Sequence, residues 1–163
     1  MAEVTSAARK ANDHIRSMGV ALTSCVIPAS GRPILRTIGS RNGNGHGPAR
    51  RTRCAAKSAG FRRFGGRRYG ESDPGRLTRQ GGDEVAVLVN GLGATPLSEL
   101  FIMFRAAHRC LRDAGLIGWR SYVGNFASSL DMAGCSFTIM RLDSELKRLL
   151  SAPAESPAFV QAG

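Results

Sequence analysis

The chain has 163 residues and a formal net charge of +11, with 42% hydrophobic and 21% charged residues. This length suits one domain or a part of a larger one, and no apolar run is long enough to span a membrane. The four cysteines, Cys25, Cys54, Cys110 and Cys135, are widely spaced and form no CxxC pair, which argues against a zinc site and for free thiols in a reducing cytoplasm.

The first expected elements are a helix and a hairpin. Apolar residues recur at helical spacing over residues 4–18, and Gly19 is suited to end that helix. The run 20–27 is typical of a buried strand, and the turn residues PASGRP lead to a second short strand at 34–38. These elements make up a first unit, residues 1–39.

The next segment differs from its surroundings in charge and in apolar content. Positions 40–80 hold eleven Lys and Arg against two acidic residues, whereas the remainder of the chain holds twelve against ten. Among Val, Ile, Leu and Met the segment contains only Leu77, so it buries too little apolar surface to offset the entropy lost on ordering. We therefore predict a disordered, Arg/Gly-rich insert at 40–81.

Alternating elements follow the insert. Residues 84–90 are predicted to form a strand, and the turn GLGA leads to a helix over about 97–114 that ends at Gly115. Thr95 is suited to cap this helix and Pro96 to occupy its first position. Its predicted buried residues are Leu97, Leu100, Phe101, Phe104 and Leu111.

Two more strands are predicted at 119–127 and 135–142, and Asp143 is suited to cap a short helix after them. Strands alternating with helices favour an α/β layer architecture, and their small number predicts a partial mixed sheet with flanking helices. The second unit is 82–158, and 159–163 form a tail.

Several stretches resemble one enzyme family. GDEVAVLVNGLGATPLSEL, SLDMAGCSFTIMRLD and APAESPA are similar to the substrate-binding domain of the dihydroxyacetone kinases, and EVTSAARKANDHIRSMGVALTSCVIPASGRP resembles the segment just before them. The resemblance covers residues 3–39 and 82–158, far more than one short motif. The family's domain is much longer than this chain. The resemblance therefore implies that the chain is a fragment, the C-terminal portion of that domain.

The resemblance implies a cytoplasmic enzyme of glycerol metabolism that phosphorylates dihydroxyacetone or a related short-chain ketose. In the family, a histidine of this domain holds the substrate carbonyl as a hemiaminal, and the phosphate comes from ATP on a separate domain or from a phosphoprotein. No cofactor or metal is therefore expected on this chain. The implied partner is a second copy or a phosphoryl-donor subunit, and neither a membrane nor a nucleic acid is expected.

The family's covalent histidine belongs to a GxHGEPG-like stretch after the hairpin, which is missing in the sequence as written. Read from the second base of each codon, RNGNGHGPARRTRCAAK permits EMEMGMGPHGEPGVRR, and DPGRLTR permits ILADLP. We interpret residues 40–81 as the product of a frameshift near Ser40 and a compensating one near Gln80. The histidine then falls across the codons of Ala49 and Arg50, His46 is a by-product, and no catalytic residue is predicted.

Other candidate residues have structural alternatives. His14 and His108 lie on predicted helices, where a surface or partly buried histidine is more common than a ligand or catalytic group. GLGATP precedes a helix and is able to cradle an anion, but it lacks the lysine of a P-loop, and a structural turn is favoured. Asp131 is an acid–base candidate or a loop cap, and Trp119 and Tyr122 suit packing positions.

Two rival functions stay open. Residues 50–68 carry enough charge to bind a phosphate backbone, with Phe61, Phe64 and Tyr69 interleaved as in RNA-binding Arg/Gly segments. If this segment binds RNA or DNA, the chain is a nucleic-acid-binding module. A frameshift, however, accounts for the same residues without any function of the segment. The other rival is a non-catalytic regulatory relative of the kinase. For the chain as written we predict no kinase activity.

Overall fold

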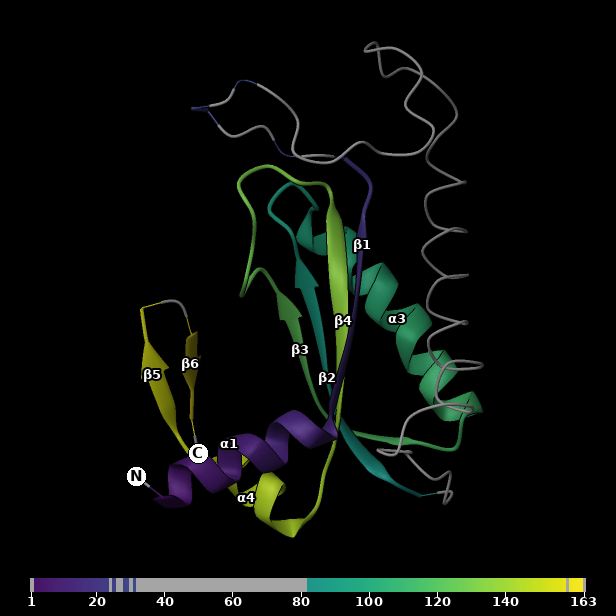
Figure 1. Cartoon of the computed structure of the whole chain (residues 1–163). Coiled ribbons are helices and arrows are strands. Elements are labelled where there is room, and N and C mark those ends of the chain that lie inside the picture. Colours follow the sequence, from purple (N-terminus) through teal and green to yellow (C-terminus); the bar gives the residue numbers. More distant parts are fainter. Residues whose placement is uncertain are drawn as a thin grey trace.

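The computed structural model describes residues 2–23, 25, 28–29, 31, 82–157 and 159–162. These residues form a four-stranded mixed sheet with helices beside it and a separate two-stranded hairpin (Figure 1). The predicted α/β class with a partial mixed sheet is confirmed. The predicted insert at 40–81 lies outside the described residues.

The sheet has the strand order β1-β4-β2-β3. Strand β2 (Glu84–Gly91) is parallel to β3 (Ile117–Gly124), and the helix α3 (Leu97–Asp113) connects them. Strand β4 (Gly134–Arg141) pairs antiparallel with β2 on one side and with β1 (Ile15–Ala21) on the other. β1, β2 and β3 therefore run in the same direction, and their carboxyl ends lie at the same edge of the sheet.

The N-terminal elements differ from the prediction. Helix α1 spans Ala2–His14, and β1 begins directly at Ile15, so the helix predicted over 4–18 is too long. Gly19, the predicted end of the helix, lies within β1. Pairing of β1 with β4 along seven residues outweighs the helical spacing of the apolar side chains. The strand predicted at 34–38 lies outside the described residues.

The second unit follows its predicted elements closely. β2, α3 and β4 begin within one residue of their predicted starts. Gly115 follows the end of α3 with a φ of 76°, a conformation that favours glycine. Asp143 caps α4 (Ser144–Ser151) as predicted, because its Oδ1 accepts a hydrogen bond from the Leu146 N–H at 2.8 Å.

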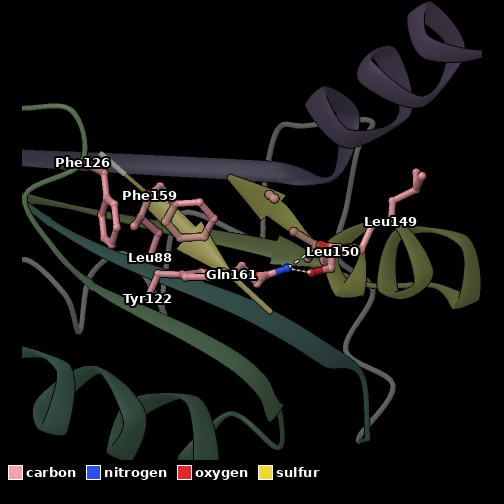
Figure 2. Close-up of a pocket in the computed structure, with 9 residues that line it drawn as sticks. Leu88, Tyr122, Phe126, Leu149, Leu150, Phe159 and Gln161 are labelled. Atoms are coloured by element: carbon pink, nitrogen blue, oxygen red, sulfur yellow. Dashed lines mark hydrogen bonds between the residues drawn. The ribbon is translucent and has the colours of Figure 1, made fainter. Parts of the chain in front are cut away.

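A hairpin follows α4 where no strand was predicted and where residues 159–163 were expected to form a tail. Its strands, β5 (Ala154–Ser156) and β6 (Phe159–Gln161), pair only with each other in the described part of the chain. The Phe159 ring packs against Tyr122 of β3, with ring centroids 5.8 Å apart, and against Phe126 at 6.0 Å (Figure 2). The hairpin thus lies on the sheet through side chains, on the face opposite α3 (Figure 1).

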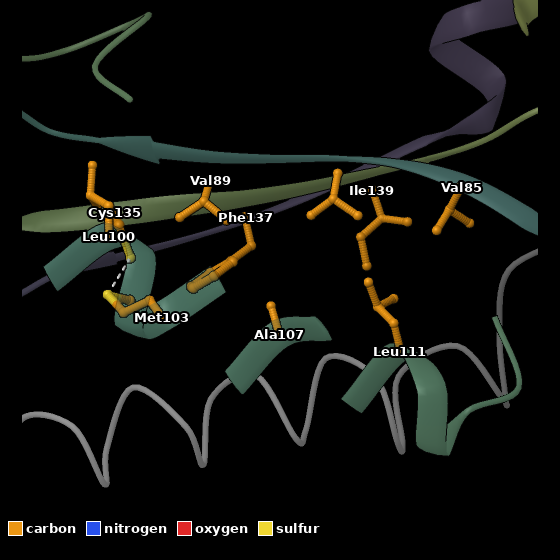
Figure 3. Close-up of a cluster of buried hydrophobic side chains, with 10 residues drawn as sticks. Val85, Val89, Leu100, Met103, Ala107, Leu111, Cys135, Phe137 and Ile139 are labelled. Carbon is orange, nitrogen blue, oxygen red and sulfur yellow. Dashed lines mark hydrogen bonds between the residues drawn. The ribbon is translucent and has the colours of Figure 1, made fainter. Parts of the chain in front are cut away.

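One hydrophobic core lies between α3 and the sheet (Figure 3). Alternate residues of β2 and β4 face the helix, since side chains of a strand alternate between its two faces. The helix contributes residues three or four positions apart, which lie on one side of it. The members are Val85, Val87, Val89, Leu100, Met103, Ala107, Leu111, Cys135, Phe137 and Ile139.

The buried side of α3 is rotated from the predicted one. Leu97 and Phe101, both predicted to be buried, are 49% and 52% exposed, whereas Met103 and Ala107 are buried. The other three predicted positions are buried or pack partly against the core. The prediction favoured large apolar side chains as the buried ones. In the structure the small Ala107 packs against the strands, and Phe101 is exposed to solvent.

A charged cluster joins α1 to the start of α4. Lys10 Nζ lies 2.6 Å from Asp143 Oδ2 and 2.5 Å from Glu145 Oε2. The hydrogen bonds to Asp143 and then Glu145 raise the pKa of Lys10, while the Leu146 N–H and then Lys10 lower the pKa of Asp143. No residue of α1 is buried, so these exposed contacts orient the helix more than they stabilise the fold.

Candidate functional site

The segment that carries the main functional prediction lies outside the described residues. It contains His46, Ala49 and Arg50, and the Arg-rich run 50–68 with its aromatic residues. The absence of the family's covalent histidine from the chain as written therefore stays a prediction. The described residues instead define the edge of the sheet at which β1 ends.

The turn GLGATP after β2 packs closely on the loop between β3 and β4. Gly93 has a φ of 113° and forms a bridge with Met132, and a Cβ at this position would lie 2.6 Å from the Ser129 carbonyl oxygen. A Cβ at Gly91 would lie 2.1 Å from the Asn125 side chain. Gly93 thus allows two backbone segments to approach closely, and Gly91 leaves room for the Asn125 side chain, which supports the structural-turn interpretation.

Thr95 holds this turn to β4 and does not cap α3. Its Oγ1 donates a hydrogen bond to the Gly134 carbonyl at 2.7 Å and accepts one from the Gly134 N–H at 2.9 Å. Pro96 takes the N-cap position, and no side chain caps the helix there. The predicted cap at Thr95 and the predicted position of Pro96 are wrong, because the hydroxyl bonds to β4 instead.

Asn90, near the end of β2, holds the loop between β3 and β4 through its side-chain amide. The residue is 3% exposed, and its Oδ1 accepts hydrogen bonds from the N–H groups of Phe126 at 2.8 Å and Ala127 at 2.9 Å. Its Nδ2 donates to the Ala127 carbonyl at 2.8 Å. Sequence reasoning missed this residue, whose signal is a polar side chain at the end of an otherwise apolar strand.

Asp131 lies on the loop that Asn90 helps to hold in place. It is exposed, and it precedes Met132, which bridges the turn after β2. The chain leaves β1 at the same edge, because the Leu22 N–H donates to the Ala133 carbonyl at 2.7 Å. One edge of the sheet thus combines a rigid turn, a rigid loop with a carboxylate and the departure point of the chain after β1.

The two described histidines lie apart from this edge and from each other. His14 is the last residue of α1, and its Nδ1 lies 2.7 Å from the Lys10 carbonyl oxygen. His108 is exposed on α3 with its ring 6.0 Å from that of Phe104. In the described ranges, no three His, Cys, Asp or Glu side chains are grouped to hold a metal ion, and no helix is long and apolar enough to cross a membrane.

The aromatic residues of β3 make packing contacts within the chain, in line with the prediction. The Arg120 guanidinium lies 4.9 Å from the ring centroid of Trp119 and donates a hydrogen bond to the Leu150 carbonyl at 2.7 Å. The Tyr122 hydroxyl donates to Gln161 Oε1 at 2.8 Å. These contacts attach α4 and the hairpin to the edge strand of the sheet.

An apolar hollow of about 310 Å³ lies on the face of the sheet opposite α3 (Figure 2). Leu88 and Tyr122, a cross-strand pair of β2 and β3, form one side of it. α4 contributes Leu149 and Leu150, and β6 contributes Phe159. No charged side chain belongs to its lining, so it is a hydrophobic surface and not a site for a phosphate or a metal ion.

Comparison with known proteins assigns the family. The Dak1 domain matches residues 1–158, a range that includes both predicted units and the segment between them. The chain therefore belongs to the Dak1 domain family, as its resemblance to the dihydroxyacetone kinases implied.

Two curated relatives show how much of the longer proteins this chain represents. The dihydroxyacetone-binding subunit DhaK of PTS-dependent dihydroxyacetone kinase 2 from Listeria innocua is 37% identical over 163 residues, which cover 96% of this chain and 47% of the relative. D-erythrulose kinase of Mycolicibacterium smegmatis is 35% identical over 163 residues, which cover 98% of this chain and 27% of that enzyme. The chain thus spans less than half the length of these relatives.

A solved structure shows the same fold. The dihydroxyacetone kinase operon co-activator Dha-DhaQ matches 100% of this chain and 51% of its own with a TM-score of 0.68 at 22% sequence identity. At this identity the likeness concerns the fold alone, and it agrees with the α/β arrangement of sheet and helices.

Proposed function

We propose that this chain is part of the substrate-binding domain of a kinase for dihydroxyacetone or another short-chain ketose in glycerol and ketose metabolism. The observation that carries the proposal is the Dak1 domain match over residues 1–158. The names of the two relatives support it, since one is a dihydroxyacetone-binding subunit and the other an erythrulose kinase. Both names refer to small ketoses, so we infer this substrate class and a cytoplasmic location.

The carboxyl ends of β1, β2 and β3 are the proposed substrate side of the described part. Ligands of open α/β sheets bind beyond the carboxyl ends of parallel strands, and β2 and β3 form such a pair. Asn90 and Thr95 make the turn and the loop at this edge rigid, which favours a preorganised site. Asp131 is the exposed carboxylate that this edge presents.

We further propose that the chain as written is catalytically inactive. By family resemblance the covalent substrate bond needs a histidine, and the shifted frame places that histidine across the codons of Ala49 and Arg50. The alignment with the Listeria relative supports a frameshift over an insertion, because its 163 positions take in 96% of this chain and leave little room for extra residues. The phosphoryl group would come from ATP or a phosphoprotein on another domain or subunit.

Resequencing the DNA that encodes residues 41–80 tests the frameshift directly. The expected result is a nucleotide sequence whose shifted frame reads EMEMGMGPHGEPGVRR, with a shift at each end. A DNA sequence that cannot be read this way would refute the interpretation.

Borohydride trapping tests the inactivity. The purified chain is incubated with dihydroxyacetone and treated with borohydride. Its intact mass is then measured by mass spectrometry. We expect no added substrate mass on the chain as written. A trapped adduct would show that a nucleophile is present after all and would contradict the proposal.

A further inference from the structure

Asn90 and Gly91, adjacent at the end of β2, form an Asn-Gly pair. Such a pair deamidates more readily than other asparagine sequences, because glycine has no Cβ to shield its backbone nitrogen. In the reaction that nitrogen loses its proton and bonds to the asparagine Cγ, and the side-chain amino group leaves with a proton as ammonia. Water then opens the resulting succinimide ring to aspartate or isoaspartate. No other reactant is needed, so the pair is able to modify itself.

The fold holds this pair in a geometry that opposes ring closure. Both residues belong to β2, and Gly91 pairs with Cys135 of β4, so closure would have to take Asn90 out of the extended strand conformation. The Asn90 amide is also held in place. Its Oδ1 accepts from the N–H groups of Phe126 at 2.8 Å and Ala127 at 2.9 Å, and its Nδ2 donates to the Ala127 carbonyl at 2.8 Å. Attack on Cγ therefore requires the loop between β3 and β4 to release this amide.

The contacts of the loop are partly open to solvent, whereas the reacting pair is not. Asn90 is 3% exposed and Gly91 is buried. Phe126, whose N–H is bound by Asn90, is 41% exposed, and its ring lies 6.0 Å from that of Phe159 and 6.5 Å from that of Tyr122 (Figure 2). Local opening of such a loop costs less free energy than global unfolding. Release of Phe126 thus gives water and the Gly91 nitrogen access to Cγ.

The products of the reaction do not fit the closed loop. In aspartate an oxygen would replace Nδ2 beside the Ala127 carbonyl, and two acceptors would face each other without a hydrogen between them. The negative charge would also lie at a position that is 3% exposed. Isoaspartate would add a methylene group to the backbone of β2 and shift Gly91 from its partner Cys135. Either product favours the open loop, so the reaction makes the opening permanent.

We propose that Asn90 and Gly91 are a latent self-modification site that the loop between β3 and β4 protects. While the loop is closed, the side-chain amide stays intact. When the loop opens, deamidation places a negative charge at the end of β2, and the loop that carries Asp131 stays released. The proposal goes beyond the proposed function and does not rest on it. It requires no substrate, phosphoryl donor or catalytic histidine, so its test is separate from the borohydride test.

Peptide mapping after incubation in a mildly alkaline buffer tests the protection, since each conversion adds one mass unit. Trypsin releases Asn90 in residues 80–105 and the Asn-Gly pairs 42–43 and 44–45 in residues 42–50. In guanidinium chloride we expect similar rates for all three asparagines, because the neighbouring glycine alone then sets the rate. Without denaturant the rate at Asn90 should be lower than in denaturant by about tenfold or more, since it follows the population of the open loop. Equal rates at Asn90 in the two conditions, or a slow Asn90 in denaturant, would overturn the proposal.

Phe126→Ala tests whether the loop controls the reaction. The variant removes the ring contacts but keeps the backbone N–H that Asn90 binds, and we expect Asn90 to react several times faster in the folded chain. Phe101→Ala is the matched control, because Phe101 is 52% exposed but lies on α3, at the other face of the sheet. No acceleration by Phe126→Ala, or the same acceleration by both variants, would overturn the proposal. If Phe126→Ala does not fold, the comparison with denaturant on the original chain still decides.

Asn90→Asp reproduces the aspartate product and tests its effect on the loop. We expect hydrogen exchange at the amides of Phe126 and Ala127 to be faster than in the original chain by about tenfold or more, because the closed loop then holds a buried charge and an unmatched acceptor. Asn12→Asp, the same change at an exposed residue of α1, should leave these amides unaltered. Unchanged exchange in Asn90→Asp would show that the reaction does not keep the loop open and would overturn that part of the proposal.

Discussion

The buried side-chain amide of Asn90 helps to hold the loop that carries Asp131. The Asn90 Oδ1 accepts hydrogen bonds from the N–H groups of Phe126 and Ala127. Asn90→Ala removes the acceptor of both groups, and because one hydrogen bond contributes about 0.5–1.5 kcal/mol, we expect a loss of about 1–3 kcal/mol in the free energy of unfolding. Urea unfolding measures the loss, and hydrogen exchange should show faster exchange at these two amides.

Ser136→Ala is the control for this prediction, because Ser136 Oγ lies 3.4 Å from Asn90 Nδ2 and makes only a long contact. We expect a clearly smaller effect from it. Equal effects of the two substitutions would mean that the hydrogen bonds of Oδ1 do not hold the loop.

At this scale the sequence revealed residue types but not partners. The turn glycines, Asp143 as a cap and the packing role of Tyr122 follow from local patterns. Thr95 was wrongly predicted to cap α3, because its hydrogen-bond partner Gly134 is 39 positions away. Local capping rules consider only the residues next to the helix. Asn90 was missed for the same reason, since its partners lie 36 and 37 positions along the chain.

Among the elements, α3 gives a test of the rotated packing. Ala107 is fully buried against the sheet, whereas Phe101 is 52% exposed. Ala107→Leu adds volume to a packed core, and we expect it to destabilise the fold by about 1–3 kcal/mol. Thermal unfolding measures the change. Phe101→Ala is the comparison, and a larger loss from it than from Ala107→Leu would support the predicted stripe instead of the observed one.

The attachment of α1 to α4 should depend on pH in two opposite ways. The lowered pKa of Asp143 means that its contribution is present above its unfolded value of 3.8 and is lost as the pH falls through the folded value. The raised pKa of Lys10 means that its contribution is present below 10.5 and is lost as the pH rises through the folded value. The contact is therefore complete between these two limits.

Lys10→Met tests this attachment. We expect faster amide hydrogen exchange in α1 at neutral pH, because the helix has no buried residue to hold it otherwise. In acid below the pKa of Asp143 the variant and the original chain should exchange alike. Arg9→Met, a change at the neighbouring exposed residue, should leave exchange unaltered. A difference that persists in strong acid would show that Lys10 acts through something other than these carboxylates.

Elements with a strong local pattern were predicted well, and the edges of the sheet were not. β2 and β4 are continuous apolar runs next to clear turn residues, so their limits follow from the sequence. β1 was placed too late and partly as a helix, because its partner β4 lies more than a hundred residues along the chain. The hairpin of β5 and β6 was missed because its strands are short and its contacts are made by side chains from β3.

For the whole molecule, the two predicted units prove to be one sheet, since β1 from the first pairs with β4 from the second. β1 ends at the edge where β4 begins, and β2 starts at the opposite edge. A connection between them must therefore cover about 23 Å, from a rise of roughly 3.3 Å for each of seven residues. A flexible linker of about 16 residues has this average span even without residues 22–40 and 81–83, which stay in place.

Replacing residues 41–80 by a Gly/Ser linker of about 16 residues tests whether the described part folds without that segment. We expect a cooperative thermal transition close to that of the original chain, because the core that the structure describes is built from α3, β2 and β4. Circular dichroism during heating is the measurement. Loss of the cooperative transition would mean that the replaced residues contribute to the core.

The strand order also bears on how the protein is synthesised. β1 is translated early, yet its neighbour β4 leaves the ribosome only after β2, α3 and β3 have been made. Until then β1 lacks the strand that it pairs with in the described part of the chain, and it is open to chaperones or to misassociation. On the frameshift interpretation, one shift near Ser40 would remove every later element, including β4, the strand that pairs with β1. The second shift, near Gln80, restores the reading frame just before Glu84, the first residue of β2. The strands β2, β3 and β4 therefore stay encoded in frame.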